Sequence, residues 1–410
     1  MKYFTLFGFS FLFTAIQAQE TVTVTTGPGN AVQTYYSLQN GVVDSRPLNE
    51  WDLAFEIPGF TASILVNTAK GMQAWKAPYA VASWNDVDTT GMAASWIRIH
   101  NSDTSWSHGA LNQGLTEDEF DLGWGMYNFV THQVAGDSIF VLKLANGEYK
   151  KLRIDGLVSS TYTFTWASLD GSNEQTGTLS KGGFAGKNFG YYSLDNAEVI
   201  DREPASSDWD LVFTKYVALS PSAYPVTGVL TNRNRPALRV DGVEPALADW
   251  QEGEYSNHIN TIGYDWKTFN MQTFQYEYDE DLSFFVYDAD GNVWQLLFFE
   301  FGGASTGDIS FTQQLMSAVS VEEVLNGNEY FTLFPNPARD GHVQLLIGGD
   351  IRNAVVTLHD MSGRMVSQQM LTGLDNGTLH TMDISPLPGG MYVVRLVGAG
   401  VSASQRLVIE

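Results

Sequence analysis

The chain contains the same block of sequence twice. Tyr35-Tyr36-Ser37-Leu38 precedes Trp51-Asp52-Leu53-Ala54-Phe55, and Tyr191-Tyr192-Ser193-Leu194 precedes Trp209-Asp210-Leu211-Val212-Phe213. The copies are separated by 156 residues (191 − 35) at the first run and by 158 residues (209 − 51) at the second. Such a period is far too long for a solenoid repeat, but it suits a duplicated globular domain. We therefore expect two copies of one scaffold.

The N-terminus has the features of an export signal. Lys2 precedes an apolar run over residues 4–13, and cleavage is expected after Ala18, so residues 1–18 are predicted to be a secretory signal peptide. No other stretch approaches the length of about 20 apolar residues that a transmembrane helix needs. The sequence contains no cysteine, so packing alone must stabilise the exported protein. The net charge of −24 repels phosphate backbones and disfavours nucleic-acid binding.

Alternation of apolar and polar residues predicts an all-β fold. Residues 21–25, 139–144, 161–166 and 284–286 are predicted strands. Asn146-Gly147 and Asp290-Gly291 are pairs typical of two-residue hairpin turns. We predict a first mainly antiparallel domain over residues 19–175, a Gly-rich linker over 176–187, a second such domain over 188–320, a linker over 321–330, and a separate segment over 331–410.

The C-terminal segment carries four separated motifs. Phe334-Pro335-Asn336-Pro337-Ala338 opens it, Asp360-Met361-Ser362-Gly363-Arg364 follows, Gly390-Met391-Tyr392-Val393-Val394 comes later, and a basic-apolar run over 406–409 closes it. Short strands between Gly and Pro turns suggest a small β-sandwich. This order resembles the type A sorting domain of the type IX secretion system over residues 331–410. The resemblance implies export across the outer membrane by that machinery, with the sorting signal at Pro335, Asn336, Pro337, Gly363, Arg364, Gly390 and Tyr392.

The second copy carries a longer series of aromatic, acidic and glycine residues. The series comprises Tyr191 to Leu194, Trp209 to Phe213, Thr231-Asn232, Ile262 to Lys267 and Phe285 to Gly291. It resembles the HmuY-like family of exported haem-binding proteins, and the first copy matches at Trp51 to Phe55 and at Asn67. The resemblance implies two tandem, mainly β domains of a kind that grips haem between two axial side chains.

An insertion distinguishes the first copy. The interval from Asn67 to Gly123 is 56 residues, whereas the corresponding interval from Asn232 to Gly263 is 31 residues. Insertions of this size usually form functional loops.

The insertion contains the predicted ligand site. Trp96, Arg98 and His100 alternate with isoleucines, so they are expected on one face of a strand. That face suits a flat, anionic ligand with a metal centre, because imidazole ligates iron, Trp packs on the macrocycle and Arg meets a propionate. We predict that His100 and His132, on a later strand, are the two ligands of a haem iron.

Two groups of acidic residues could form other kinds of site, one catalytic and one for calcium. Asp52 and Asp210 each follow a motif Trp, and their recurrence in both copies favours a structural role over general acid–base catalysis. The oxygen-rich stretch that includes Asp288 and Asp290 could bind calcium, but it occupies the place of the plain turn at Asn146-Gly147, which favours a solvated hairpin.

The sequence lacks the elbow of serine hydrolases and the zinc motif of metalloproteases, and nothing in it argues for an enzyme, so we predict a binding protein. One hypothesis is an exported cell-surface protein that binds haem or another porphyrin through the first domain. The alternative is a non-catalytic surface scaffold or adhesin, which could recognise glycan through exposed Trp and Tyr side chains. A carbohydrate-active enzyme is a third hypothesis, and it would require a carboxylate pair across a cleft.

Overall fold

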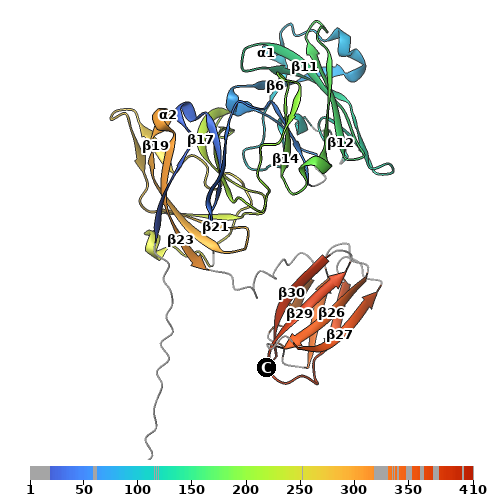
Figure 1. Cartoon of the computed structure of the whole chain (residues 1–410), viewed down its shortest axis with the longest axis vertical. Coiled ribbons are helices and arrows are strands. Elements are labelled where there is room, and N and C mark those ends of the chain that lie inside the picture. The colour runs from blue at the N-terminus through green and yellow to red at the C-terminus, as the bar shows by residue number, and fades with distance from the viewer. Residues whose placement is uncertain are drawn as a thin grey trace, which may run out of the picture. The chain divides into compact units, whose positions relative to one another are not determined.

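The computed structural model describes residues 19–317 without 59–61, 115, 117, 119 and 252, and residues 331–409 without 335, 337, 339–340, 348–352, 361–363, 373–377 and 399–400. The chain divides into two compact units, Met1–Ser317 and Ala318–Glu410. Paired antiparallel strands make up most of both units, which confirms the all-β prediction (Figure 1). The predicted signal peptide at 1–18 and the predicted linker at 321–330 lie outside the described residues.

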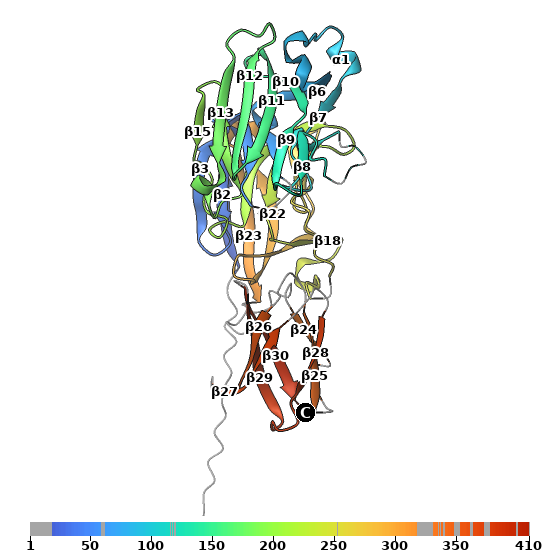
Figure 2. The same cartoon turned by 90° about the vertical axis from the view of Figure 1, so that its right-hand side faces the viewer.

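The first unit contains two lobes. The first lobe has a large sheet in the order β13 (Gln175–Ser180), β12 (Thr161–Ser168), β11 (Tyr149–Val158), β10 (Ser138–Lys143), β6 (Gln73–Ala80), β7 (Ile97–Ile99). The hairpin β8 (Gly125–Asn128) and β9 (Gln133–Gly136) extends this sheet beside the end of β11 (Figure 2). A smaller sheet in the order β15 (Glu198–Ile200), β14 (Phe189–Ser193), β4 (Leu53–Glu56), β5 (Ile64–Val66) completes the lobe.

The second lobe repeats this plan. Its large sheet has the order β1 (Glu20–Thr25), β23 (Asp308–Ser317), β22 (Val293–Phe301), β21 (Leu282–Tyr287), β18 (Ala237–Asp241). Its smaller sheet has the order β17 (Tyr224–Thr231), β16 (Leu211–Ala218), β2 (Val32–Ser37), β3 (Gly41–Pro47). A separate hairpin joins β19 (Lys267–Asn270) and β20 (Gln275–Tyr278).

The helical segments are short. The α-helical turns are α1 (Met92–Ser95) and α2 (Gly303–Thr306). The 3₁₀ turns are η1 (Pro28–Asn30), η2 (Thr68–Lys70), η3 (Val81–Asp86), η4 (Ala110–Asn112), η5 (Lys181–Phe184) and η6 (Pro245–Leu247).

The two copies of the repeat exchange strands. β2, which carries Tyr35-Tyr36, pairs with β16 of the second copy, and β14, which carries Tyr191-Tyr192, pairs with β4 of the first copy. β1 is likewise the edge strand of the second large sheet and pairs with β23. Its counterpart in the first large sheet is the edge strand β13, which pairs with β12. Figure 1 shows the blue N-terminal strands among the yellow and orange strands of the second lobe.

This exchange corrects the predicted domain boundaries. Strands β1 to β3 belong to the second lobe, so the first lobe is continuous from β4 to β15, and the second lobe is formed from both ends of the unit. The predicted linker at 176–187 is also wrong, because most of it forms strand β13 and turn η5. The predicted strands at 21–25, 139–144, 161–166 and 284–286 are confirmed as β1, β10, β12 and β21 within one residue at most ends.

The central strands of the smaller sheets are buried on both faces. Along β4, Leu53 and Phe55 enter the core of the first lobe, and Ala54 between them joins a cluster with Trp51 and Tyr191. This arrangement follows from the period of two residues in a strand, which sends successive side chains to opposite faces. The same alternation holds in β16, where Leu211 and Phe213 enter the second core while Val212 joins Tyr35 and Trp209. The outward faces of the two smaller sheets therefore meet between the lobes.

The C-terminal unit is a β-sandwich, as predicted. One sheet has the order β24 (Phe331–Phe334), β25 (His342–Ile347), β28 (Thr378–Asp383), and the other has the order β27 (Met365–Thr372), β26 (Asn353–Asp360), β29 (Gly390–Gly398), β30 (Val401–Ile409). One core takes buried residues from both sheets, among them Leu345, Val356 and Leu396.

Candidate functional site

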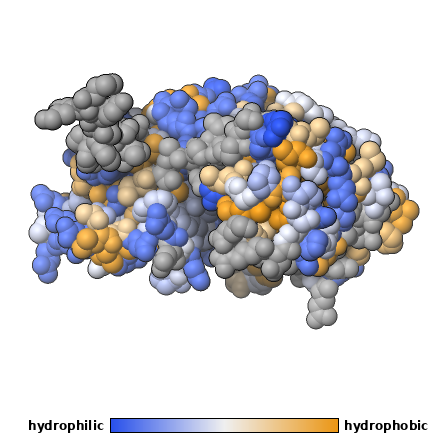
Figure 3. All heavy atoms as spheres, turned by 90° about the horizontal axis from the view of Figure 1, so that it is seen from below, coloured by the Kyte–Doolittle hydropathy of each residue, from blue (hydrophilic) through white to orange (hydrophobic). Residues whose placement is uncertain are grey.

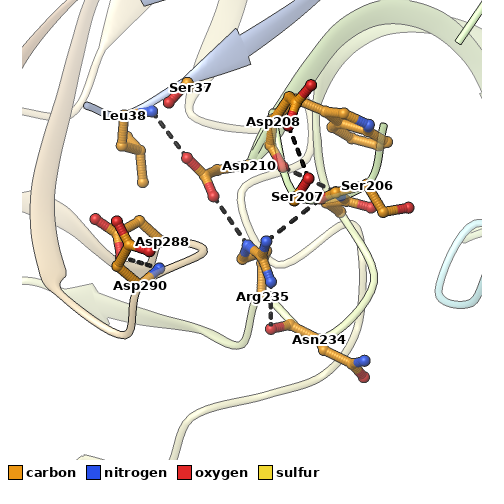
Figure 4. Close-up of polar contacts among 12 residues, drawn as sticks. Ser37, Leu38, Ser206, Ser207, Asp208, Asp210, Asn234, Arg235, Asp288 and Asp290 are labelled. Atoms are coloured by element: carbon orange, nitrogen blue, oxygen red, sulfur yellow. Dashed lines mark hydrogen bonds and ion pairs between the residues drawn. The ribbon is translucent and has the colours of Figure 1, made fainter. Parts of the chain in front are cut away.

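The two motif aspartates, Asp52 and Asp210, each bind the backbone directly after the exchanged strand of their lobe. Asp210 accepts a hydrogen bond from the backbone N–H of Leu38 at 2.9 Å and an ion-paired bond from Arg235 Nε at 2.8 Å (Figure 4). Asp52 accepts the equivalent bond from the N–H of Leu194 at 2.7 Å and pairs with Lys70 at 2.5 Å. Both carboxylates are almost fully buried, and each has a cation that compensates its charge and a backbone N–H that donates to it. The predicted structural role of this pair is the one that the geometry supports.

Three hollows follow the junction between the lobes. A central cavity of about 70 Å³ lies between the outward faces of the smaller sheets. It shares Trp106 and Asn188 with a polar groove of about 920 Å³, and it shares Ala69 and Lys215 with a second groove of about 400 Å³. We call these the central cavity, the polar groove and the basic groove.

The central cavity is lined by matching aromatic pairs from the two copies. Tyr35 meets Trp209 edge to face at a centroid distance of 5.1 Å, and Tyr191 meets Trp51 at 5.2 Å. Trp106, from the insertion of the first copy, also lines this cavity. Edge-to-face pairs of this kind stabilise the packing of the cavity walls beyond the area that they bury.

One carboxyl group is buried beside these rings. Glu203 Oε2 accepts a hydrogen bond from the hydroxyl of Tyr191 at 2.7 Å, and Oε1 accepts one from the backbone N–H of Asn188 at 3.0 Å. Burial raises the pKa of Glu203 to about 7, against the lowering effects of these two bonds and of the cations of Arg202 and Arg233. The central cavity thus has a wall that gains charge near neutral pH.

The polar groove is lined by amides, hydroxyls and guanidinium groups. Ser207, Asn234 and Asn257 are exposed at its surface, and Ser107 and Arg235 are half-buried. The indole of Trp106 lies at the boundary with the central cavity and donates its N–H to the carbonyl of Thr231 at 2.9 Å. The groove therefore presents many directional donors and acceptors together with one aromatic ring.

Arg233 connects the two lobes at the base of this groove. Its guanidinium donates to Ser107 Oγ at 2.8 Å and to the carbonyl of Trp106 at 3.2 Å. It also pairs with the buried Glu56 at 2.6 Å. These contacts hold the insertion of the first copy against the second lobe, and so they fix the shape of the polar groove.

The predicted haem residues are divided among three places. Arg98 and His100 line the basic groove, whereas Trp96 packs at the other end of β7 against Tyr79, with ring centroids 5.9 Å apart. Trp96 ends helix α1 and is not in the strand, which explains why it does not share the face of Arg98 and His100. Burial and the nearby Arg98 both lower the pKa of His100.

His132 lies at the tip of the β8–β9 hairpin, away from His100. Ile99, the neighbour of His100, is opposite Ala74 of β6. Ala74 is opposite Leu142 of β10, and Leu142 is opposite Lys150 of β11. Val134, near His132, is opposite Leu157. Lys150 and Leu157 are seven residues apart on β11 (157 − 150). At about 3.3 Å per residue, the two histidines are therefore more than about 20 Å apart along the strand direction. They do not meet at one iron atom.

The position of His132 is explained by the repeat itself. The turn Asn128-Phe129-Val130-Thr131-His132-Gln133 matches Asn270-Met271-Gln272-Thr273-Phe274-Gln275 at the tip of the β19–β20 hairpin. In both turns the Asn side chain accepts two backbone N–H groups, and the residue at the place of His132 or Phe274 has a positive φ. The sequence carries this second repeat, which would have identified His132 as the counterpart of Phe274.

The acidic hairpin of the second lobe is a turn, as predicted, but Asp288 is not solvated. It is buried, and its oxygens accept hydrogen bonds from the side chains of Asn292, Trp294 and Gln39. These bonds lower the pKa of Asp288 against the effect of its burial. Within the residues that the structure describes, no group of three or more His, Asp or Glu side chains is placed to hold a metal ion.

The sorting-signal residues that the structure describes stabilise the C-terminal sandwich. Asn336 accepts the N–H of Val408 at 2.9 Å and donates to the carbonyl of Arg406 at 2.7 Å. Arg364 pairs with Asp360 at 3.0 Å, and the hydroxyl of Tyr392 donates to the carbonyl of Pro388 at 2.8 Å, two residues before Gly390. Pro335, Pro337 and Gly363 lie outside the described residues.

Comparison with known proteins identifies the C-terminal unit. Residues 332–410 match the family described as the secretion system C-terminal sorting domain. This unit is therefore a type IX sorting domain, which directs the protein to the type IX secretion machinery and to a secreted or cell-surface location. In the described part of the chain, none of the helices has the length and apolar character that crossing a membrane would require.

The remaining comparisons add little. No curated protein matches the chain. Dimeric latent PorU from Porphyromonas gingivalis is a similar solved structure at 10% identity and a TM-score of 0.16, and the match covers 92% of this chain and 33% of that one. The chain thus spans about a third of that protein's length, and the likeness is too slight to bear on function. The resemblance of the duplicated units to the HmuY-like family stays a prediction.

Proposed function

We propose that the first unit is a non-catalytic, surface-displayed module that binds glycan in the polar groove. One observation carries this proposal: amide, hydroxyl and guanidinium groups line a hollow of about 920 Å³ that also contains an aromatic ring. Sugar rings offer many hydroxyl groups and an apolar face. Side chains such as Asn234, Asn257 and Ser207 supply the matching donors and acceptors, and the ring of Trp106 supplies an apolar surface.

The position of the polar groove also favours a ligand site there. In the part of the molecule drawn in colour, Figure 3 shows hydrophobic residues in several separate patches with hydrophilic residues between them. Ligand sites lie preferentially in concave regions between domains, where a ligand contacts several walls at once. The polar groove meets this condition, since its walls come from both lobes.

A haem-binding function would have to take a different form from the one predicted. His100 lies in the basic groove beside Arg98, but His132 is at a distant hairpin tip. A porphyrin in this groove would therefore have His100 as its histidine ligand without His132. We favour the glycan module because it uses the larger groove and requires no second axial ligand.

The test is a glycan array probed with the chain from residue 19 to residue 317, followed by titration of the best glycan. We expect Asn257→Ala and Ser207→Ala together to weaken binding about thirtyfold, at about 1 kcal/mol for each of the two net hydrogen bonds. Trp106→Ala should weaken it further, while Trp106→Phe should keep most of the stacking. Phe129→Ala, an exposed aromatic at a hairpin tip, is the matched control. Silence on the array, or binding that all these substitutions leave unchanged, would refute the proposal.

A further inference from the structure

The basic groove concentrates positive charge in a strongly acidic protein. Lys70, Arg98, His100 and Lys215 all line it, and no Asp or Glu is among its lining residues. The whole chain has 46 acidic against 22 basic residues. A hollow that collects four basic side chains and excludes carboxylates is therefore unusual for this molecule.

Two of these cations are available to a ligand. The ammonium of Lys70 is paired with the buried Asp52, so its charge is already compensated. Arg98 is exposed and Lys215 is half-buried, and in the part of the chain that the structure describes neither forms an ion pair with a carboxylate. A guanidinium is suited to bind a carboxylate through two parallel hydrogen bonds, and an ammonium adds a point charge.

His100 forms part of the groove wall beside Arg98. Burial and, second to it, the cation of Arg98 lower the pKa of His100. The backbone N–H of His100 is held by the side-chain oxygen of Gln113 at 3.3 Å, which fixes this residue at the wall of the groove.

We propose that the basic groove binds one carboxylate group of a small sugar acid, either free or at the end of a glycan. Its volume of about 400 Å³ lies within the range of small-molecule sites. The net charge of −24 repels a polyanion over the rest of the surface, so a ligand with a single anionic group is favoured over a polyuronate. Arg98 and Lys215 bind the carboxylate, and Gly29, Ala31, Ala69 and Gly71, which also line the groove, have small or no side chains and leave room for the sugar ring.

This inference is independent of the proposed function, because the polar groove shares no lining residue with the basic groove. Calorimetric titration of residues 19–317 with D-glucuronate, with D-glucose as the neutral control, tests it directly. We expect glucuronate to bind and glucose not to bind. Arg98→Gln should weaken glucuronate binding by about tenfold or more, because it removes a charge-assisted hydrogen bond. Lys215→Gln should weaken it by a smaller factor.

Controls separate the possible outcomes. Lys150→Gln removes a cation on β11 outside the three hollows and should leave glucuronate affinity unchanged. A disaccharide with a terminal glucuronate that binds more tightly than the monomer would identify a glycan end, and equal or weaker binding would identify the free acid. Equal affinity for glucose, absence of glucuronate binding, or full affinity in Arg98→Gln would overturn the proposal. Neutral-glycan binding in the polar groove would be unaffected by any of these results.

Discussion

Glu203 should make the stability of the first unit depend on pH. Its side chain is buried at 2% exposure, and its pKa is about 7 in the folded protein against an ordinary value of 4.5. Because the folded state holds the proton more tightly than the unfolded state, this group contributes its full stability below pH 4.5. That contribution is lost as the pH rises through about 7.

The size of the effect follows from the two pKa values. A rise from 4.5 to about 7 in the pKa, at about 1.4 kcal/mol for each tenfold change in proton affinity, corresponds to about 3 kcal/mol of unfolding free energy. Glu203→Gln should remove this dependence. The amide oxygen can accept the N–H of Asn188, and the amide nitrogen can donate to the hydroxyl of Tyr191 once that hydroxyl rotates.

Urea unfolding of residues 19–317 at several pH values between 4.5 and 8.5 measures the effect. The difference in unfolding free energy between Glu203→Gln and the unchanged protein should grow by about 3 kcal/mol in favour of the variant across this interval. Comparing the two proteins at each pH cancels the contribution of every other titrating group. A difference that stays constant with pH would show that Glu203 does not titrate as its burial requires.

Three other results are expected. Asp210→Ala should lower the unfolding free energy by about 3–5 kcal/mol in denaturant titrations, because it leaves Arg235 without its buried partner, whereas the exposed Asp208→Ala should change it by less than about 0.5 kcal/mol. Residues 48–206 should fold alone, as measured by circular dichroism. Residues 207–317 should fold only when residues 19–47 are attached after residue 317 by a short linker. Independent folding of residues 207–317 would contradict the strand exchange. Haemin added to residues 19–317 should give no bis-histidine absorption spectrum, and such a spectrum that disappears in both His100→Ala and His132→Ala would show that the hairpin tip moves to the groove.

The positions of the strands could be predicted from the sequence, but their partners could not. Alternation in β1, β10 and β12 identifies strands and their buried faces, because the period of two is a property of each segment alone. Partner choice in a duplicated chain is ambiguous in the sequence. Tyr35-Tyr36 and Tyr191-Tyr192 have the same pattern, and each would suit β4 as well as β16. The exchange between copies is therefore visible only in the structure.

The residues of the candidate site could also be predicted only in part from the sequence. Arg98 and His100 were placed together by local alternation, and both line the basic groove. Trp96 was misplaced because one turn of helix ends at it, and a helix of four residues leaves no periodic signal. Lys215 of the basic groove and Glu203 of the central cavity could not be predicted as wall residues, because both hollows form where the two lobes meet and neither copy contains them alone.

The strand exchange sets an order for folding. All strands from β4 to β15 lie within one continuous stretch, so the first lobe can fold as soon as residues 53–200 have been made. The second lobe has to wait, because Glu20 pairs with Gln313 at the far end of the unit. Long-range pairing of this kind is slow, and its unpaired edges are exposed in the meantime. Before residues 191–194 have been made, residues 35–38 are free to occupy the place on β4 that belongs to them. Closure of the second lobe is thus expected to be the slow step in which a newly made chain becomes a correctly paired one.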